Sequence, residues 1–246
     1  MHLVKFSLKL CCIRVFHFFV TQEHFLGHTF SFQRYDQFFV GFLDEFVLRQ
    51  HFFIADCDDP FIVDGGGNIG MSSFFFKHLY PKCHIAVFEP DPKNFEDLKK
   101  NLSSFEHIDF YCMALSDAQE VVPFFRDNIH FTGGSISVPP NNTEQLTVKT
   151  CQIADVISRD IDYMKLDIEG AEEKVMRHIK ESFSYRIKIF FIEYHYNARA
   201  PYNHLSFLLE FLEGREYTYT IGSPLLPYGK ISAPFTCIIV ATHHTP

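Results

Sequence analysis

Phe61-Ile-Val-Asp-Gly-Gly-Gly-Asn-Ile-Gly70 carries the strongest local signal in the sequence. Its apolar start, Phe61 to Val63, predicts a buried strand that stops at Asp64. A glycine-rich turn follows, and Met71-Ser-Ser-Phe-Phe-Phe-Lys-His-Leu-Tyr80 predicts a helix. A strand, a glycine turn and a helix in this order bring bare backbone close to a ligand at the N-terminus of the helix. Glycine suits such a turn because a Cβ atom would block the approach or a positive φ angle.

Two overlapping motifs in this segment imply different ligands. Gly65, Gly67 and Gly70 form G-x-G-x-x-G, the dinucleotide-binding fingerprint. D-x-G-x-N-x-G, which runs from Asp64 to Gly70, resembles the first motif of enzymes that use S-adenosylmethionine (SAM). A turn that only reverses the chain is a third interpretation, so the rest of the sequence has to decide.

The composition suits one large globular domain. The 246 residues are 47% hydrophobic, which is enough for a sizeable core, and we interpret the 30 phenylalanines as core filling. The net charge of -8 argues against a general nucleic-acid binder, which needs a basic surface to neutralise phosphates. The 7 cysteines are odd in number and lack C-x-x-C spacing, so we expect a reduced, cytoplasmic environment.

Residues 1–59 are expected to form a helical or mixed extension that covers a core domain of residues 60–246. His2 to Val20 is apolar, but two lysines and an arginine interrupt it too often for a membrane-spanning helix. No small-residue cleavage site of a signal peptide follows. We therefore expect an amphipathic helix packed on the domain, and a peripheral membrane contact is the less favoured interpretation.

Beyond the glycine turn, apolar strands alternate with helices. Strands are predicted at 84–89, 108–113, 163–169, 187–195, 217–221 and 235–241, and helices at 94–102, 171–182 and 204–212. This alternation implies an α/β fold with a mostly parallel sheet and helices on both faces. The last strand has no helix after it, so we expect it to run antiparallel at or near an edge.

An irregular excursion interrupts this alternation. Strands are predicted at 121–125 and 146–151, the second one antiparallel, with a loop at 127–142 between them and a short helix at 153–158. Excursions of this length are usually functional or disordered. Gly133-Gly-Ser-Ile-Ser137 in the loop is a candidate lid over a substrate, and a solvated surface loop is the equal alternative.

Acidic residues follow the core strands at the ends where an open parallel sheet binds its ligands. Glu89 comes about twenty residues after the glycine turn, the position at which an acid accepts hydrogen bonds from ribose hydroxyls. A carboxylate there repels a 2′-phosphate, which disfavours NADP and leaves NAD and SAM open. The alternative is a strand-end acid in water.

Met164-Lys-Leu-Asp-Ile-Glu-Gly-Ala-Glu172 is the second strong signal. Asp167 and Glu169 are two residues apart at a strand end, so alternation would send both carboxylates to the same side. Such a pair can orient a substrate hydroxyl, take its proton or share a divalent cation. Glu172 is interpreted as a favourable charge in the first turn of the next helix. A dinucleotide fold has no particular need for this second acidic strand end.

Several segments together resemble the FkbM family of methyltransferases in their order and approximate spacing. They are Asp64–Gly70, Val87-Phe-Glu-Pro-Asp-Pro92, Ala114-Leu-Ser-Asp117, Met164–Glu172 and Ile192-Glu-Tyr-His195. The resemblance covers roughly residues 60–195, and the family usually has Ala in place of Gly67. It implies a Rossmann-like class I methyltransferase fold with one antiparallel strand near the edge of the sheet. It also implies SAM as methyl donor and O-methylation of a sugar, glycan or other small molecule.

The resemblance also implies roles for individual residues. The glycine loop would hold the methionine end of SAM, Glu89 its ribose, and the segment from Ala114 to Asp117 its adenine. The cofactor-binding residues are then Asp64, Gly65, Gly66, Gly67, Asn68, Gly70, Glu89, Ala114, Leu115 and Asp117. The catalytic residues are Asp167 and Glu169, which would face the methyl acceptor, and Glu193 and His195 across the cleft.

His195 is a candidate general base because the ordinary pKa of histidine lies near neutrality, and Asp167 is the competing candidate. Two acids and a histidine at strand ends are compatible with a metal ion but do not demand one, so no metal ligand is assigned. The favoured function is a SAM-dependent O-methyltransferase that acts on a small-molecule or glycan acceptor and not on nucleic acid. The alternatives are an NAD-linked oxidoreductase and a non-catalytic SAM-binding module.

Overall fold

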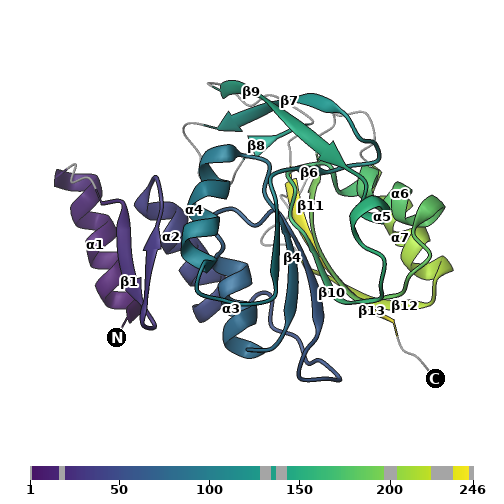
Figure 1. Ribbon diagram of the computed structural model, residues 1–246, viewed down its shortest axis with the longest axis horizontal. Helices are drawn as coiled ribbons and strands as arrows, with labels where there is room; N and C mark the ends of the chain where they lie inside the picture. The colour runs from purple at the N-terminus through teal and green to yellow at the C-terminus, as the bar shows by residue number, and fades with distance from the viewer. Residues whose placement is uncertain are drawn as a thin grey trace.

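The computed structural model describes residues 2–16, 20–127, 134–136, 143–196, 204–222 and 235–243. A seven-stranded sheet forms its centre, with helices on both faces (Figure 1), so the predicted α/β class is confirmed. The strands, in spatial order, are β12 (Tyr217–Gly222), β13 (Phe235–His243), β11 (Ile187–Tyr196), β10 (Ile161–Leu166), β3 (Phe61–Gly65), β4 (His84–Phe88) and β5 (Ile108–Tyr111).

The direction of the strands follows the predicted class I methyltransferase pattern. Strands β5, β4, β3, β10 and β11 are parallel neighbours. Strand β13 is antiparallel to both β11 and β12, which places the antiparallel strand beside the edge, as expected. The chain builds the sheet in one direction from β3 to β5 and in the other from β10 onwards, so the strand order reverses between β3 and β10. Open α/β sheets bind their ligands at this reversal.

Two layers of helices cover the sheet. On one face lie α3 (Met71–Leu79), α4 (Pro92–Leu102) and the N-terminal segment, and on the other lie α5 (Ile153–Val156), α6 (Glu172–Ser182) and α7 (Leu205–Gly214) (Figure 1). Strand β10 contributes side chains to both layers because successive side chains of a strand alternate between the two faces of the sheet. Tyr163 packs in the α3 layer, whereas Met164 and Leu166 pack in the α6 layer. The same alternation directs Lys165 toward the α3 layer.

The N-terminal segment contains short strands and helices. They are α1 (His2–Phe16), β1 (Gln22–Phe25), β2 (His28–Ser31), α2 (Tyr35–Phe42) and the π-helix η1 (Leu43–Val47). Its phenylalanines pack edge to face, with ring centroids 4.9 Å apart for Phe6 and Phe42 and 5.3 Å apart for Phe25 and Phe42. These rings belong to the same apolar cluster as Phe74 of α3, which confirms that phenylalanine fills the core.

The expected N-terminal helix forms, but the expectation that it is amphipathic was wrong. Phe6 is fully buried, whereas Val4 and Leu8 are 64% and 62% exposed, so apolar side chains lie on both sides of α1. No helix within the described ranges is long and apolar enough to cross a membrane. The division into 1–59 and 60–246 stays a prediction, and one apolar cluster runs across that boundary.

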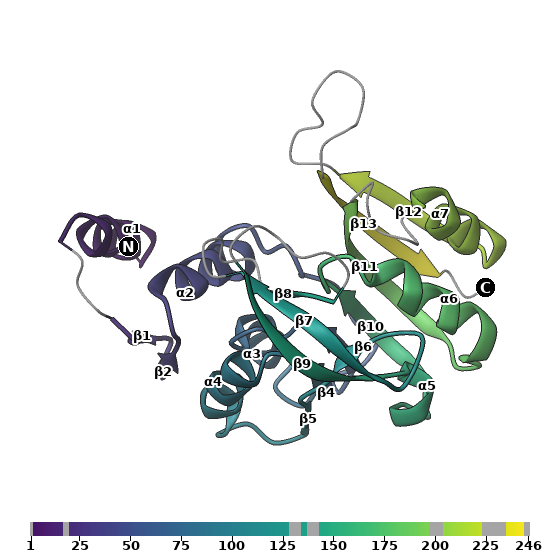
Figure 2. The ribbon, with the colours of Figure 1, turned by 90° about the horizontal axis from the view of Figure 1, so that it is seen from above.

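The excursion forms a second, smaller sheet. Its strands are β6 (Ala114–Leu115), β9 (Thr143–Cys151), β7 (Val121–Asp127) and β8 (Gly134–Ser135). Strands β7 and β9 are antiparallel, which confirms the direction predicted for the strand at 146–151. This sheet lies across the carboxyl ends of the core strands, as the view from above shows (Figure 2). Most of the predicted loop at 127–142, with Gly133 and Ser137 of the candidate lid, lies outside the described residues.

Two boundaries near the site differ from prediction. Strand β3 continues through Asp64 to Gly65 instead of stopping at Asp64. Strand β10 ends at Leu166, so Asp167 and Glu169 lie in the following loop and not in a strand. Glu169 has a left-handed φ of 53°, so the predicted reason for the placement of its carboxylate, strand alternation, was wrong.

Candidate active site

The glycine turn passes through the point where the strand order reverses. Gly66 has a φ of 84° and Asn68 a φ of 47°. The backbone N–H groups of Gly66 and Gly67 both donate to the carbonyl of Phe88, at 3.0 and 2.9 Å, which ties the turn to the end of β4. A Cβ atom on Gly66 would lie 1.9 Å from the carbonyl oxygen of Asp167. Both the φ angle and this close approach therefore require glycine at position 66.

Glu89 connects the glycine turn to α4. Its carboxylate accepts hydrogen bonds from the backbone N–H of Asn68 at 2.8 Å and of Asp91 at 2.9 Å. Burial raises the pKa of Glu89 to about 7, against the lowering effect of these two N–H groups and of nearby Lys165, and Asp91 acts in the same direction as burial. The buried carboxylate keeps lone pairs for further hydrogen-bond donors.

Asp64 and Lys165 form a buried ion pair beneath the turn. The Asp64 carboxylate is fully buried and accepts hydrogen bonds from the hydroxyls of Ser72 and Ser73 at 2.6 and 2.7 Å. The Lys165 Nζ lies 3.5 Å from Asp64 Oδ1 and 3.3 Å from Asp167 Oδ2, and it donates to the Gly66 carbonyl at 2.8 Å. Burial acts to lower the pKa of Lys165, but Asp167 and Asp64 outweigh it and hold this pKa above its usual value. The lysine stays charged and fixes both carboxylates.

His195 lies among three glutamates. Its Nδ1 is 3.0 Å from Glu172 Oε1, and its Nε2 is 3.4 Å from Glu169 Oε2 and 3.8 Å from Glu193 Oε1. Glu172 does lie in the first turn of α6, as predicted, but it is buried and does more than stabilise the helix end. The same carboxylate accepts from the backbone N–H of Gly170 at 3.1 Å. Glu172 therefore holds the acidic loop and the imidazole ring in place together.

The pKa values of the acidic groups and of His195 are shifted because these side chains are buried close to one another. Burial raises the pKa of Glu169 to about 8 and that of Glu193 to about 7, and Asp167 adds to both shifts. Burial also acts to raise the pKa of Asp167, but Lys165 and His195 outweigh it and hold this pKa below its usual value. For His195, burial acts to lower the pKa, but Glu172 and Glu169 outweigh it and the pKa lies well above its usual value. The cluster thus attracts positive charge.

Two cavities meet at the glycine turn. The first encloses about 590 Å³, including its open mouth, and is lined by Glu89, Ala114, Leu115, Phe124 and Ile136. The second encloses about 1100 Å³ and is lined by Asp44, Glu45 and His51 of the N-terminal segment and by Lys165, Glu193 and His195 of the core. Gly66, Asn68, Asp167 and Glu169 belong to the walls of both. A ligand in the first cavity therefore reaches the second beside the Asp167 and Glu169 carboxylates.

Most of the predicted site residues lie on these walls, and a few do not. Among the predicted cofactor residues, those absent from both walls are Asp64, Gly65, Gly70 and Asp117. Asp64 faces Ser72 and Ser73 instead, and Gly65 packs against the Lys165 backbone, where a Cβ would lie 3.0 Å from the carbonyl oxygen. The four predicted catalytic residues all line the second cavity. At Gly67, a Cβ would lie 2.4 Å from Val87 Cγ2, so alanine there requires the valine side chain to move.

Arg126 of β7 supports the candidate site through contacts that the sequence did not reveal. Its guanidinium binds both carboxylate oxygens of Asp91, the residue that caps α4, and also pairs with Glu144 at 2.5 Å. Asp91 is buried and lies two residues after Glu89. This contact holds the small sheet over the first cavity, where Phe124 forms part of the wall.

The sequence over residues 64–221 matches the Methyltransferase FkbM domain family. The match covers more than half of the chain. This protein belongs to the FkbM methyltransferase domain family. The matched region contains the glycine turn, Glu89, the acidic loop and His195, and it therefore contains the residues that form the junction of the two cavities.

Individual proteins similar to this FkbM-family chain are distant in sequence. The 2-O-methyltransferase NoeI of Sinorhizobium fredii is 27% identical over 167 residues, which cover 60% of this chain and 68% of NoeI. Methyltransferase 1 of Beauveria bassiana is 28% identical over 169 residues, which cover 56% of this chain and 68% of that protein. A crystal structure of methyltransferase FkbM from Methylobacillus flagellatus shares 18% identity at a TM-score of 0.47, over 74% of this chain and 44% of that one.

Proposed function

We propose that this chain transfers a methyl group from SAM to a hydroxyl group of a sugar, a glycan or another small molecule. Its family supports methyl transfer, and a relative that is named a 2-O-methyltransferase supports oxygen as the acceptor atom. The observation that carries the proposal is the junction of the two cavities at Asp167 and Glu169. One cavity suits a nucleoside, and the other offers carboxylates to a polar acceptor.

The residues of the first cavity fit SAM. Gly66 presents bare backbone to this cavity, and a side chain there would overlap the Asp167 carbonyl group. The buried Glu89 carboxylate has lone pairs available for the two ribose hydroxyls, while Ala114, Leu115 and Phe124 offer apolar walls to an adenine ring. Gly66 and Asn68 line both cavities, so the methionine end of SAM would extend along them toward the second cavity.

The second cavity would hold the acceptor against the four predicted catalytic residues. When bound, SAM supplies a methyl group on a positively charged sulfur. The task of the protein is to hold the acceptor oxygen in line with that methyl, which supplies much of the acceleration of a displacement reaction. The hydroxyl also has to lose its proton, and His195 and Asp167 are the two candidate general bases. Because Glu172 and Glu169 hold the pKa of His195 well above its usual value, this ring has to give up its own proton before it can act as the base.

A methyl-transfer assay with isotope-labelled SAM tests the proposal. With a panel of oligosaccharides and small polyols, we expect label on an acceptor oxygen. His195→Gln is expected to lower the rate by about 10²–10⁴-fold, the usual contribution of a group that assists proton transfer. The control Glu120→Gln alters an exposed side chain before β7 and should retain full activity. Transfer to nitrogen or carbon alone would contradict O-methylation.

SAM binding should depend on pH through Glu89. In the protein without SAM, the Glu89 carboxyl has a pKa of about 7. Ribose hydroxyls bind better to the ionised carboxylate, so a protonated Glu89 has to release its proton when SAM binds. The affinity should therefore stay constant above this pKa and fall about tenfold for each pH unit below it. Calorimetric titrations on either side of neutrality measure this slope.

Glu89→Gln provides the matched control for the pH dependence. The amide is neutral at every pH, so this variant should bind SAM weakly and with little change of affinity across the same range. An affinity of the wild type that stays constant through neutrality would contradict the assignment of Glu89 to the ribose.

A further inference from the structure

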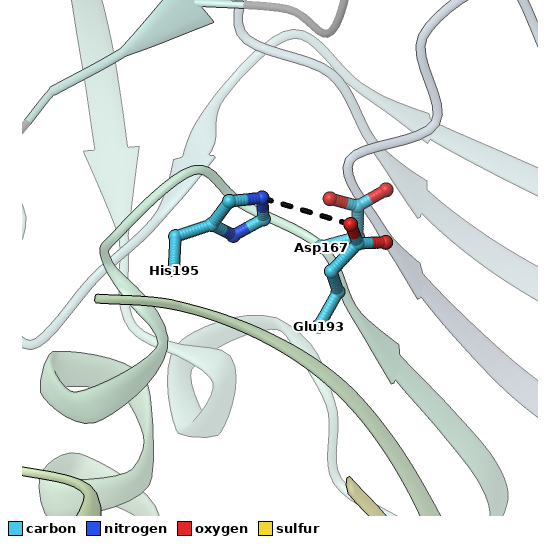
Figure 3. A group of neighbouring side chains, drawn as sticks. All are labelled: Asp167, Glu193 and His195. Carbon is cyan, nitrogen blue, oxygen red and sulfur yellow. Dashed lines mark ion pairs between the residues drawn. The ribbon is translucent and has the colours of Figure 1, made fainter. Parts of the chain in front are cut away.

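Asp167, Glu193 and His195 converge on one point of the second cavity (Figure 3). Each offers one ligand atom, and these atoms all lie within 4.8 Å of one another. The fold explains the convergence, because Leu166 of β10 pairs in register with Ile192 of β11 and the next residues along are Asp167 and Glu193. His195 follows Glu193 on the same side of β11. We propose that Asp167, Glu193 and His195 bind a divalent metal ion.

The His195 ring is held in the orientation that a metal ligand needs. Glu172 is buried and lies 3.0 Å from Nδ1, so the ring donates its Nδ1–H to a carboxylate and turns Nε2 toward Glu169 and Glu193. Metal-binding histidines usually donate their other ring N–H to such a carboxylate, which fixes the tautomer and the ring plane.

A second carboxylate–histidine pair, from the N-terminal segment, lines the same cavity. Glu45 Oε1 and His51 Nδ1 are 2.7 Å apart, and His51 is only 4% exposed. Its Nε2 is buried and has no hydrogen-bond partner among the described residues. A buried polar atom without a hydrogen-bond partner destabilises the folded protein. His51 lines the same cavity as Asp167 and Glu193, so its free nitrogen can serve an occupant of that cavity.

The charge of the cavity wall favours a cation. Among the described residues, the wall carries one lysine and two histidines against five acids, which are Asp44, Glu45, Asp167, Glu169 and Glu193. Lys165 is shared between Asp167 and Asp64, so it does not balance the remaining acids. A divalent ion bound at the three ligands would compensate this excess where the acidic groups are most crowded.

The mixed nitrogen and oxygen ligands indicate the kind of metal. Mg²⁺ and Ca²⁺ prefer oxygen ligands only, whereas Mn²⁺ and Zn²⁺ accept imidazole together with carboxylates. The role of the ion rests on the proposed function. An acceptor hydroxyl that binds the ion would be oriented at the junction of the cavities and would lose its proton more easily.

Electron paramagnetic resonance of Mn²⁺ tests the site without any methyl-transfer assay. The full chain is first treated with a chelator and then titrated with Mn²⁺, whose free signal decreases as it binds. We expect one tight site, with ¹⁴N modulation in the spin-echo spectrum from the His195 ring, and competition by Zn²⁺.

Three variants locate the ion. Glu193→Gln and His195→Gln should weaken Mn²⁺ binding by at least about 100-fold, and His195→Gln should also remove or reduce the ¹⁴N modulation. Glu172→Gln alters a positioning residue and should weaken binding by about 10–100-fold. The control Glu120→Gln removes an exposed carboxylate and should bind as the wild type does. Circular dichroism confirms that each variant is folded.

The outcomes separate this inference from the proposed function. SAM binding is measured by calorimetry on the same samples. If SAM binds but Mn²⁺ does not bind at millimolar concentration, or binds equally well to wild type and to folded Glu193→Gln and His195→Gln, the metal site is refuted and the proposed function stands. If Mn²⁺ binds as expected but SAM does not, the proposed function fails and the metal site stands.

Discussion

Gly66→Ala is expected to lower the free energy of unfolding by roughly 3–5 kcal/mol, because the left-handed φ and the steric overlap add together. The φ of 84° disfavours any side chain, and the new Cβ would lie 1.9 Å from the Asp167 carbonyl oxygen. That oxygen belongs to the backbone and cannot turn aside as a side chain can. Relief would require the turn to move away from the acidic loop, which would also open the junction of the two cavities. We therefore expect the variant to lose SAM binding.

Gly27→Ala is the matched control for this substitution. Gly27 has nearly the same φ, 82°, but nothing lies within 4 Å of a Cβ at that position. Its substitution should cost only about 1–2 kcal/mol, the penalty of the left-handed conformation. Urea unfolding followed by circular dichroism measures both variants. Equal destabilisation by the two substitutions would mean that the turn does not approach the Asp167 backbone as closely as described.

Lys165→Met is expected to destabilise the protein by roughly 3–5 kcal/mol, the usual effect of removing one partner of a buried ion pair. Lys165 is 3% exposed and Asp64 is fully buried, so the substitution would leave a buried carboxylate without the cation that compensates it. The variant also loses the hydrogen bond to the Gly66 carbonyl. We expect both a lower unfolding midpoint in urea and weaker SAM binding.

A second substitution identifies the cause of the effect of Lys165→Met. Asp64→Asn removes the uncompensated charge, and its amide oxygen can still accept hydrogen bonds from Ser72 and Ser73. The variant that carries both Lys165→Met and Asp64→Asn should therefore recover about 1–3 kcal/mol of unfolding free energy relative to Lys165→Met alone. Lys149→Met, on the exposed side of β9, serves as the control and should change stability little. Failure of Asp64→Asn to recover any stability would show that the ion pair is not the source of the effect.

The fold was predictable because its signals are local. The apolar run before the glycine turn, the helical spacing of Phe95, Leu98 and Leu102, and the absence of a helix after the last strand each act over a few neighbouring residues. These patterns were sufficient to predict the α/β class and the antiparallel direction of the last strand. The end of β10 was harder to predict, because Ile168 continues the apolar alternation although the chain has already turned.

The sequence indicates individual candidate residues but not the network of contacts that joins them. The sequence places acids at the strand ends, yet the pairing of Arg126 with Asp91 joins residues 35 positions apart through a separate sheet. The Glu45–His51 pair reaches the cavity from the N-terminal segment, far from the FkbM motifs. Glu172 meets His195 beyond a loop in which Glu169 and Gly170 adopt left-handed φ angles of 53° and 98°. Contacts of this kind depend on tertiary packing, which local patterns do not encode.

Calorimetric titration of the purified protein with SAM tests the central claim, that the glycine turn and Glu89 form a SAM site. At a pH above the pKa of Glu89, we predict one SAM molecule bound per chain, competition by S-adenosylhomocysteine, and much weaker binding to Glu89→Ala. NAD should give no heat of binding under the same conditions. Tighter binding of NAD than of SAM, or SAM binding of equal affinity in wild type and Glu89→Ala, would contradict the claim.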